Sequence, residues 1–187
     1  MTILVAYASK HGSTASIAER IGDTLRARGY AADVKPIGDV DDLSPYAASV
    51  IGGAVYFGSW LKDLTKFIDR HQLTLAEHPV WLFSSGPLGN ETSDVQGCDV
   101  RESSVPKEVD SVASTVHARD HRVFFGALDH TTFNVCERLL WTLPPTHSLL
   151  VEGDFRDWPD VESWAMGIAN QLDHEHIDVY AQLDQAR

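Results

Sequence analysis

Short runs of mostly apolar residues alternate along this chain with longer stretches in which apolar residues recur every three or four positions. Such runs are typical of strands buried on both faces of a sheet. They predict strands at residues 3–7, 31–37, 49–55, 79–85 and 122–128. The second run alternates only weakly, which favours a place near the edge of the sheet. Gly52 and Gly53 in the third run indicate that another part of the molecule packs closely there.

The stretches between these runs have the apolar spacing of amphipathic helices. They predict helices at residues 15–27, 61–71, 105–118, 133–143 and from 159 onward. Gly29 closes the first helix, and the prolines at 144–145 end the fourth. The acidic run 39–42 is expected to form a turn and the start of a helix. Strands alternating with helices predict an α/β fold, an open parallel sheet with helices on both faces.

Composition narrows the class of protein. The chain has 187 residues, 43% hydrophobic and 22% charged, which fits one globular domain with a sizeable core. The formal net charge of −12 argues against binding to nucleic acid or to a polyanionic membrane surface. The acidity leaves two explanations open, attraction to basic partner proteins or solubility alone.

The cysteines and the hydropathy of the chain indicate the cellular compartment of the protein. Cys98 and Cys136 lie far apart without a metal-binding spacing, so we expect a reduced, cytoplasmic protein. No apolar run approaches the length of a membrane span. Residues 3–6 are expected to form a strand and not part of a targeting sequence.

A turn rich in hydroxyl groups, residues 9–14, joins the first predicted strand to the first predicted helix. This arrangement presents backbone N–H groups and a helix N-terminus to an anion. Gly12 permits the backbone to approach an anion closely. Lys10 is the only fixed positive charge in the turn, so neutral donors would do most of the anion binding. A phosphate monoester such as that of FMN suits these hydroxyl and backbone N–H donors. A serine-capped helix with nothing bound explains the same residues equally well.

Two more loops follow the third and fourth predicted strands. Residues 56–60 place three aromatic side chains around a glycine, and residues 84–89 are rich in serine and glycine. Ligands of open parallel sheets bind outside the carboxyl ends of the strands, so these loops should meet the turn 9–14. A cluster of loop aromatics favours stacking on a flat heteroaromatic ring. For any single aromatic here, packing onto the following helix is an equally good explanation.

These stretches resemble those of the flavodoxin-like FMN proteins. Ser9, Gly12 and Thr14 match the phosphate loop of that family, and the two later loops fall where its members flank the isoalloxazine ring. More narrowly, the chain is similar to the menaquinone-dependent protoporphyrinogen IX dehydrogenase branch, in the stretches 50–54, 57–58, 125–128 and 155–158. The resemblance implies one flavodoxin-like domain over residues 1–187, with sheet order 2-1-3-4-5 and an inserted segment at about 131–153.

The resemblance also implies one FMN, bound non-covalently, with no metal and no catalytic side chain assigned. His11 stands where many flavodoxins have threonine, and we expect its side chain to lie in solvent rather than to donate to the phosphate. The peptide near Gly58 is expected to hydrogen-bond the flavin N5, in acidic surroundings that disfavour an anionic reduced flavin. The implied cofactor-binding residues are Ser9, Lys10, His11, Gly12, Ser13, Thr14, Tyr56, Phe57, Gly58, Ser59, Trp60, Ser84, Ser85, Gly86, Pro87, Leu88 and Gly89.

Two classes of function follow. The first is an FMN-dependent oxidoreductase of the protoporphyrinogen dehydrogenase-like branch, acting on a planar substrate or a quinone. The second is an electron-transfer flavodoxin without a substrate of its own, which docks to basic redox partners. A homodimer is left open in both. The segment 131–153 distinguishes them, since a wall beside the flavin would imply a substrate pocket.

Other reactive residue types receive structural explanations. The stretch 174–176 contains two histidines and a glutamate but no further ligand at a useful spacing, so a solvated role is expected. Cys136 suits an inert thiol in a helix. His117 and His121 flank a helix-to-strand turn and are expected to cap it. No spacing supports a Ser-His-Asp triad or a pair of catalytic carboxylates.

Overall fold

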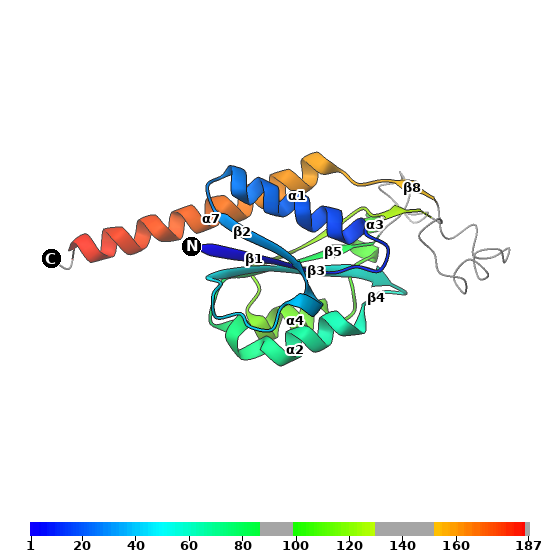
Figure 1. Cartoon of the computed structure of the whole chain (residues 1–187), viewed down its shortest axis with the longest axis horizontal. Coiled ribbons are helices and arrows are strands. Elements are labelled where there is room, and N and C mark those ends of the chain that lie inside the picture. The colour runs from blue at the N-terminus through cyan, green and yellow to red at the C-terminus, as the bar shows by residue number, and fades with distance from the viewer. Residues whose placement is uncertain (87–98, 130–151, 186–187) are drawn as a thin grey trace.

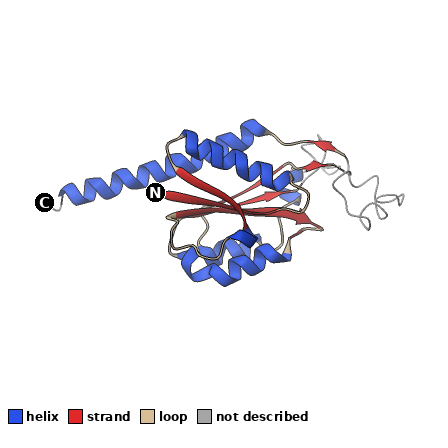
Figure 2. Ribbon diagram, viewed as in Figure 1, coloured by secondary structure: helices blue, strands red, loops and turns tan. Residues whose placement is uncertain are grey.

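The computed structural model describes residues 1–86, 99–129 and 152–185. A central sheet lies between two layers of helices (Figures 1 and 2). The helix predicted at 133–143, both cysteines and the body of the inserted segment lie outside the described residues, so those predictions stay predictions.

The five predicted strands form one parallel sheet. Their bounds are β1 Thr2–Ala8, β2 Ala31–Pro36, β3 Ala48–Tyr56, β5 Val80–Ser85 and β6 Asp120–Phe124. They lie in the order β2-β1-β3-β5-β6, the order 2-1-3-4-5 of the five predicted segments. The sheet differs in one detail, because a short unpredicted strand, β4 (Ser59–Trp60), pairs antiparallel with β3. The α/β flavodoxin-like fold class is confirmed.

Helices α1 (Ser13–Ala27) and α7 (Trp158–Gln185) cover one face of the sheet, and α2 (Lys62–Ala76) and α4 (Val109–Val116) cover the other (Figure 1). Because successive strand residues point to opposite faces, Ile3 and Val5 pack toward α1 while Leu4 and Ala6 pack toward α2. All four are fully buried. Two apolar cores therefore hold the sheet from both sides.

The paired glycines of β3 are required by this packing. A Cβ on Gly52 would lie 2.3 Å from the Phe83 ring, and one on Gly53 would lie 2.7 Å from Leu64. Real Cβ atoms do not approach other atoms so closely. The predicted close packing on the third strand is confirmed.

Two segments differ from the sequence prediction. The acidic run starts no α-helix. Its first residue, Asp39, ends a 3₁₀ turn, η1 (Ile37–Asp39), and the Asp42 carboxylate accepts the Ser44 N–H at 2.9 Å in a local turn that competes with helix formation. The fifth strand ends at Phe124 and not at Leu128. Beyond it the Gly126 carbonyl accepts the Phe155 N–H at 3.1 Å, and β7 (Ala127–Leu128) pairs antiparallel with β8 (Gly153–Asp154) in a separate small sheet.

The remaining helices differ mainly in length. The helix predicted at 61–71 extends to Ala76, and the one predicted at 105–118 is confined to α4. A four-residue helix that was not predicted, α3 (Val100–Ser103), precedes α4. No described helix is long and apolar enough to cross a membrane.

Candidate functional site

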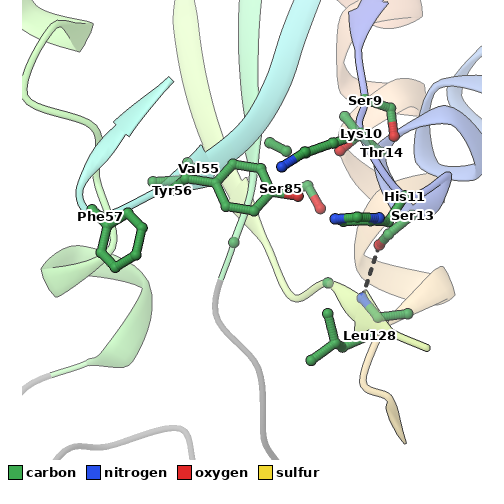
Figure 3. Close-up of a pocket in the computed structure, with 14 residues that line it drawn as sticks. Ser9, Lys10, His11, Ser13, Thr14, Val55, Tyr56, Phe57, Ser85 and Leu128 are labelled. Atoms are coloured by element: carbon green, nitrogen blue, oxygen red, sulfur yellow. Dashed lines mark hydrogen bonds between the residues drawn. The ribbon is translucent and has the colours of Figure 1, made fainter. Parts of the chain in front are cut away.

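Four loops meet in a cleft of about 370 Å³ at the carboxyl edge of the sheet (Figure 3). They follow β1, β3, β5 and β6, as the topology of an open parallel sheet requires. Its lining residues are Ser9, Lys10, His11, Ser13, Thr14, Ala54, Val55, Tyr56, Phe57, Ser85, Gly86, Gly126, Ala127 and Leu128. None of these residues is acidic, although the chain as a whole is, so the expected acidic surroundings are not found in the described lining.

The turn after β1 exposes the start of α1 to this cleft. Gly12 is the N-cap residue and has φ +87°, a left-handed conformation that favours glycine. The helix has no side-chain capping bond and no acidic residue in its first turn. The Ser9 hydroxyl instead accepts the Gly12 N–H at 3.0 Å within the turn. A serine-capped helix is thus not what forms, and the positive end of the α1 dipole faces the cleft.

Hydroxyl groups also tie this turn to the neighbouring loops. The Ser13 hydroxyl oxygen accepts the Ala127 N–H at 2.8 Å (Figure 3, dashed line), and the Ser16 hydroxyl donates to the Ser13 carbonyl at 2.8 Å. Arg156 donates to the Ser16 hydroxyl and, at 2.7 Å, to the Asp154 carboxylate. These hydrogen bonds from Arg156 lower the pKa of Asp154, so that carboxylate stays charged and the guanidinium stays in place. The turn 9–14 and the start of α1 are therefore fixed against β7 and β8.

His11 does not lie in solvent, contrary to the expectation. It is half-buried, lines the cleft and meets the Tyr56 ring edge-on, with ring centroids 6.4 Å apart. The Lys10 ammonium lies 5.8 Å from the centroid of the same ring. The cleft thus presents an ammonium, an imidazole and a phenol beside the helix N-terminus.

The loop of three aromatics is a two-residue hairpin that joins β3 to β4. Phe57 and Gly58 have φ of 52° and 73°, the positive pair of a type I′ turn. Tyr56 points into the cleft, whereas the fully exposed Phe57 lies at its rim (Figure 3). The Gly58 carbonyl accepts the Lys107 N–H at 3.1 Å, so the tip is fastened to the segment before α4.

Trp60 lies behind the cleft instead of in its lining. Its indole N–H donates to the Ser84 hydroxyl at 2.9 Å, and both side chains are buried. Nε2 of His121 lies 2.8 Å from the same hydroxyl. His121 therefore does not cap a helix, whereas His117, with φ 53°, is the left-handed residue that ends α4. In the stretch 174–176, which was expected to be solvated, Glu175 forms an ion pair with Arg119, far from the cleft.

Comparison with protein families decides the family. A domain family described as "Flavodoxin domain" matches residues 4–143, which is most of the chain. This chain belongs to the flavodoxin domain family. Members of the family are flavoproteins, typically with FMN. No curated protein matches the chain.

Solved structures with the flavodoxin domain fold agree with this assignment. A flavodoxin from the domain Archaea is 17% identical over 93% of this chain and 100% of its own, with a TM-score of 0.58. Oxidised flavodoxin 2 from Bacillus cereus is 19% identical over 91% and 99%, with a TM-score of 0.57. The rubredoxin oxygen:oxidoreductase of Desulfovibrio gigas is 11% identical over 92% of this chain and 36% of its own, with a TM-score of 0.57. At these identities the likeness shows the fold alone.

The flavodoxin domain brings about half of the predicted site residues into the cleft itself. Those that line it are Ser9, Lys10, His11, Ser13, Thr14, Tyr56, Phe57, Ser85 and Gly86. Those that lie next to it without lining it are Gly12, Gly58, Ser59, Trp60 and Ser84. Pro87, Leu88 and Gly89 lie outside the described residues. The lining residues that were not predicted are Ala54, Val55, Gly126, Ala127 and Leu128. Gly126, Ala127 and Leu128 lie in the stretch 125–128, and the family resemblance of that stretch was the one signal that could have assigned them to the site.

The donor set fits a flavin phosphate. A phosphate monoester carries about two negative charges at neutral pH. The cleft offers the uncapped N-terminus of α1, serine and threonine hydroxyls and Lys10, with no carboxylate in the described lining. The Tyr56 ring supplies a flat face a short way from these donors. Phosphate and heteroaromatic ring could therefore be held in one cleft.

Proposed function

We propose that this flavodoxin domain binds one FMN non-covalently in the cleft at the carboxyl edge of the sheet. The observation that carries this proposal is the uncapped N-terminus of α1, which begins in left-handed Gly12 and opens into a cleft lined by Tyr56. Residues 9–14 would hold the phosphate through backbone N–H groups and hydroxyls, as helix N-termini hold anions. The hydrogen bond from Ala127 to Ser13 keeps that turn in register with the opposite wall.

The two later loops would hold the ring. Tyr56 and Ser85 point into the cleft, and we assign residues 57–60 and 84–89 to the ring-binding loops as the family resemblance implies. FMN, when bound, supplies the redox chemistry. The Gly58 carbonyl is engaged by the Lys107 N–H, so turning that peptide toward N5 requires that one hydrogen bond be broken. A Gly58→Ala variant with unchanged flavin potentials would remove the support for an N5 contact there.

We further propose that the protein is an FMN-dependent oxidoreductase of the protoporphyrinogen IX dehydrogenase-like branch, with a planar substrate or quinone. The support is the pairing of β7 with β8. Leu128 lines the cleft and pairs with Gly153, so the segment between them leaves and re-enters the fold beside the proposed flavin. We treat residues 131–153 as an insertion in a single domain, as the family resemblance implies.

A second candidate is an electron-transfer flavodoxin that docks to basic redox partners. Two observations favour it. The chain carries a net charge of −12, and Phe57 offers a fully exposed aromatic ring at the rim of the cleft. Exposed aromatic residues next to a cofactor suit a transient protein contact.

One preparation tests both candidates. Purified protein is mixed with FMN, freed of excess by gel filtration and examined by visible absorption. Retained flavin bands would support the cofactor proposal, and a colourless protein would overturn it. The loaded protein is then mixed with protoporphyrinogen and a quinone. Turnover supports the oxidoreductase, whereas reduction and reoxidation by protein partners without turnover supports the carrier.

A further inference from the structure

A chain of hydrogen bonds links three strands beneath the cleft, from the buried Trp60 and Ser84 to the half-buried His121. Trp60 of β4 donates its indole N–H to the Ser84 hydroxyl of β5 at 2.9 Å, and that hydroxyl lies 2.8 Å from Nε2 of His121 on β6. Trp60 is 4% exposed and Ser84 0%. The Trp60 and His121 rings also meet edge to face, with centroids 6.0 Å apart. The contacts join groups that are 24 and 37 residues apart in sequence.

The direction of these hydrogen bonds fixes where the protons are. An indole N–H can only donate, so the Ser84 oxygen accepts from Trp60. Ser84 has one hydroxyl proton, and within the described residues only Nε2 of His121 receives it. We therefore assign Nε2 as the acceptor, which is the one arrangement that also gives the Ser84 hydroxyl proton a partner, and place the proton of the neutral ring on Nδ1.

Protonation of His121 would break this arrangement. The imidazolium has N–H groups at both nitrogens, so Nε2 would have to donate to an oxygen that already accepts from Trp60. The proton of the fully buried Ser84 hydroxyl would then lack an acceptor among the described residues. Burial lowers the pKa of His121, while the carboxylates of Asp120 on β6 and Asp110 on α4 act in the opposite direction. From β4 and β5 the ring meets only uncharged groups, Trp60 and Ser84.

The chain of hydrogen bonds reaches the cleft through the β3–β4 hairpin. Trp60 pairs with Val55 and Ser59 pairs with Tyr56, and both Val55 and Tyr56 line the cleft. We propose that His121 is a positioning residue. In its neutral form it acts through Ser84 and Trp60 to hold the hairpin where Tyr56 meets the flavin, and its protonation loosens the hairpin and weakens flavin binding. This inference rests on the proposed binding of FMN.

The same face of the sheet contains a matched control. Nε2 of His78 lies 3.0 Å from the hydroxyl of Ser49, near the amino edge of β3. Burial lowers the pKa of His78 as well. Within the described residues, neither side chain hydrogen-bonds to the β3–β4 hairpin, so the titration of His78 should not reach the cleft.

The first experiment measures FMN affinity between about pH 8 and pH 5.5 in wild type, His121→Gln, His121→Phe and His78→Gln. The phosphate of FMN itself titrates near pH 6, so the comparison between variants is decisive. On acidification to pH 5.5, wild type should lose up to about threefold more affinity than His121→Gln, whose amide oxygen accepts in place of Nε2 and does not titrate. His121→Phe should bind weakly at every pH, and His121→Gln should rescue that loss. His78→Gln should follow wild type.

The second experiment needs no flavin. The indole N–H resonance of Trp60 should shift with pH in wild type and His78→Gln, and should stay constant in His121→Gln and Ser84→Ala. If no variant binds FMN at any pH, the proposed function fails while this titration still tests the hydrogen-bond chain. An equal pH dependence of affinity in wild type and His121→Gln, or its loss in His78→Gln, would overturn the inference.

Discussion

The carboxyl and amino edges of the sheet contain matching parts with different surroundings. Helix α1 begins at the carboxyl edge in Gly12, with φ +87°, and is followed at the amino edge by Gly29, with φ +91°. At the first end no side chain caps the helix, and the end opens into a cleft. At the second, the Gly29 and Tyr30 N–H groups bond back to helix carbonyls at 2.9 and 3.1 Å. One end is closed by its own backbone, and the other is left available for a ligand.

Tyr30 strengthens the closed edge. Its hydroxyl bonds to Asp173 of α7, and burial together with that carboxylate raises the pKa of Tyr30 to about 12. Arg28 donates to the same carboxylate at 3.0 Å. Two glycines with the same left-handed backbone conformation can therefore serve the fold at one edge and a ligand at the other.

The largest effect is expected from alanine at the two glycines. A Cβ would meet no atom within 4 Å at either position, so the left-handed backbone alone is strained, by about 1–2 kcal/mol. Gly12→Ala and Gly29→Ala should both lower the free energy of unfolding by that amount. Only Gly12→Ala should also weaken FMN binding, by roughly tenfold, because the turn relaxes away from the phosphate. Equal FMN affinities in the two variants, measured by titration, would remove the distinction between the edges.

Acid should destabilise both edges. Burial lowers the pKa of His71, His78 and His121, so these rings are neutral in the folded protein and charge more readily when it unfolds. Their contribution to stability is complete above the unfolded value of about 6.5 and is lost as pH falls through the lower folded values. Urea midpoints should therefore be constant above about pH 7 and fall below pH 6.5. A midpoint that rises on acidification over this range would contradict the assignment.

The smallest effect concerns two exposed apolar residues. Phe57 is fully exposed in a left-handed conformation, and Leu73 is 79% exposed on α2 toward the amino edge. Asparagine is favoured at the first position of a type I′ turn, so Phe57→Asn should stabilise the protein by about 0.5–1 kcal/mol. Leu73→Gln should change stability by less than about 0.5 kcal/mol. Thermal unfolding measures both, and a destabilised Phe57→Asn would show that the ring contributes to the fold.

The sheet could be predicted because its determinants are local. Buried parallel strands are apolar throughout, and helices keep their period, so β1, β3 and β5 and the start of α1 can be read from short windows. The end of β6 could not. Residues 122–128 are one apolar run, and the strand stops because Gly126 pairs with Phe155, a residue remote in sequence.

The candidate site, like the sheet, could be predicted only where its determinants are local. The turn 9–14 has a local signature, and the cleft forms there. The β3–β4 hairpin has none, because Phe57 stands where a type I′ turn usually has asparagine or glycine. The contact of Trp60 with Ser84 and His121 joins three strands and depends on sheet register, which no sequence window contains.

The short ladder between β7 and β8 gives the chain between Leu128 and Gly153 the geometry of a closed loop. Once the ends of a loop are joined, the entropy of closure grows only with the logarithm of its length, and each doubling adds only about 0.6 kcal/mol. Lengthening or shortening this loop therefore changes stability little. In evolutionary terms, the ladder is a junction at which loop length can change while the sheet and the turn 9–14 are left intact.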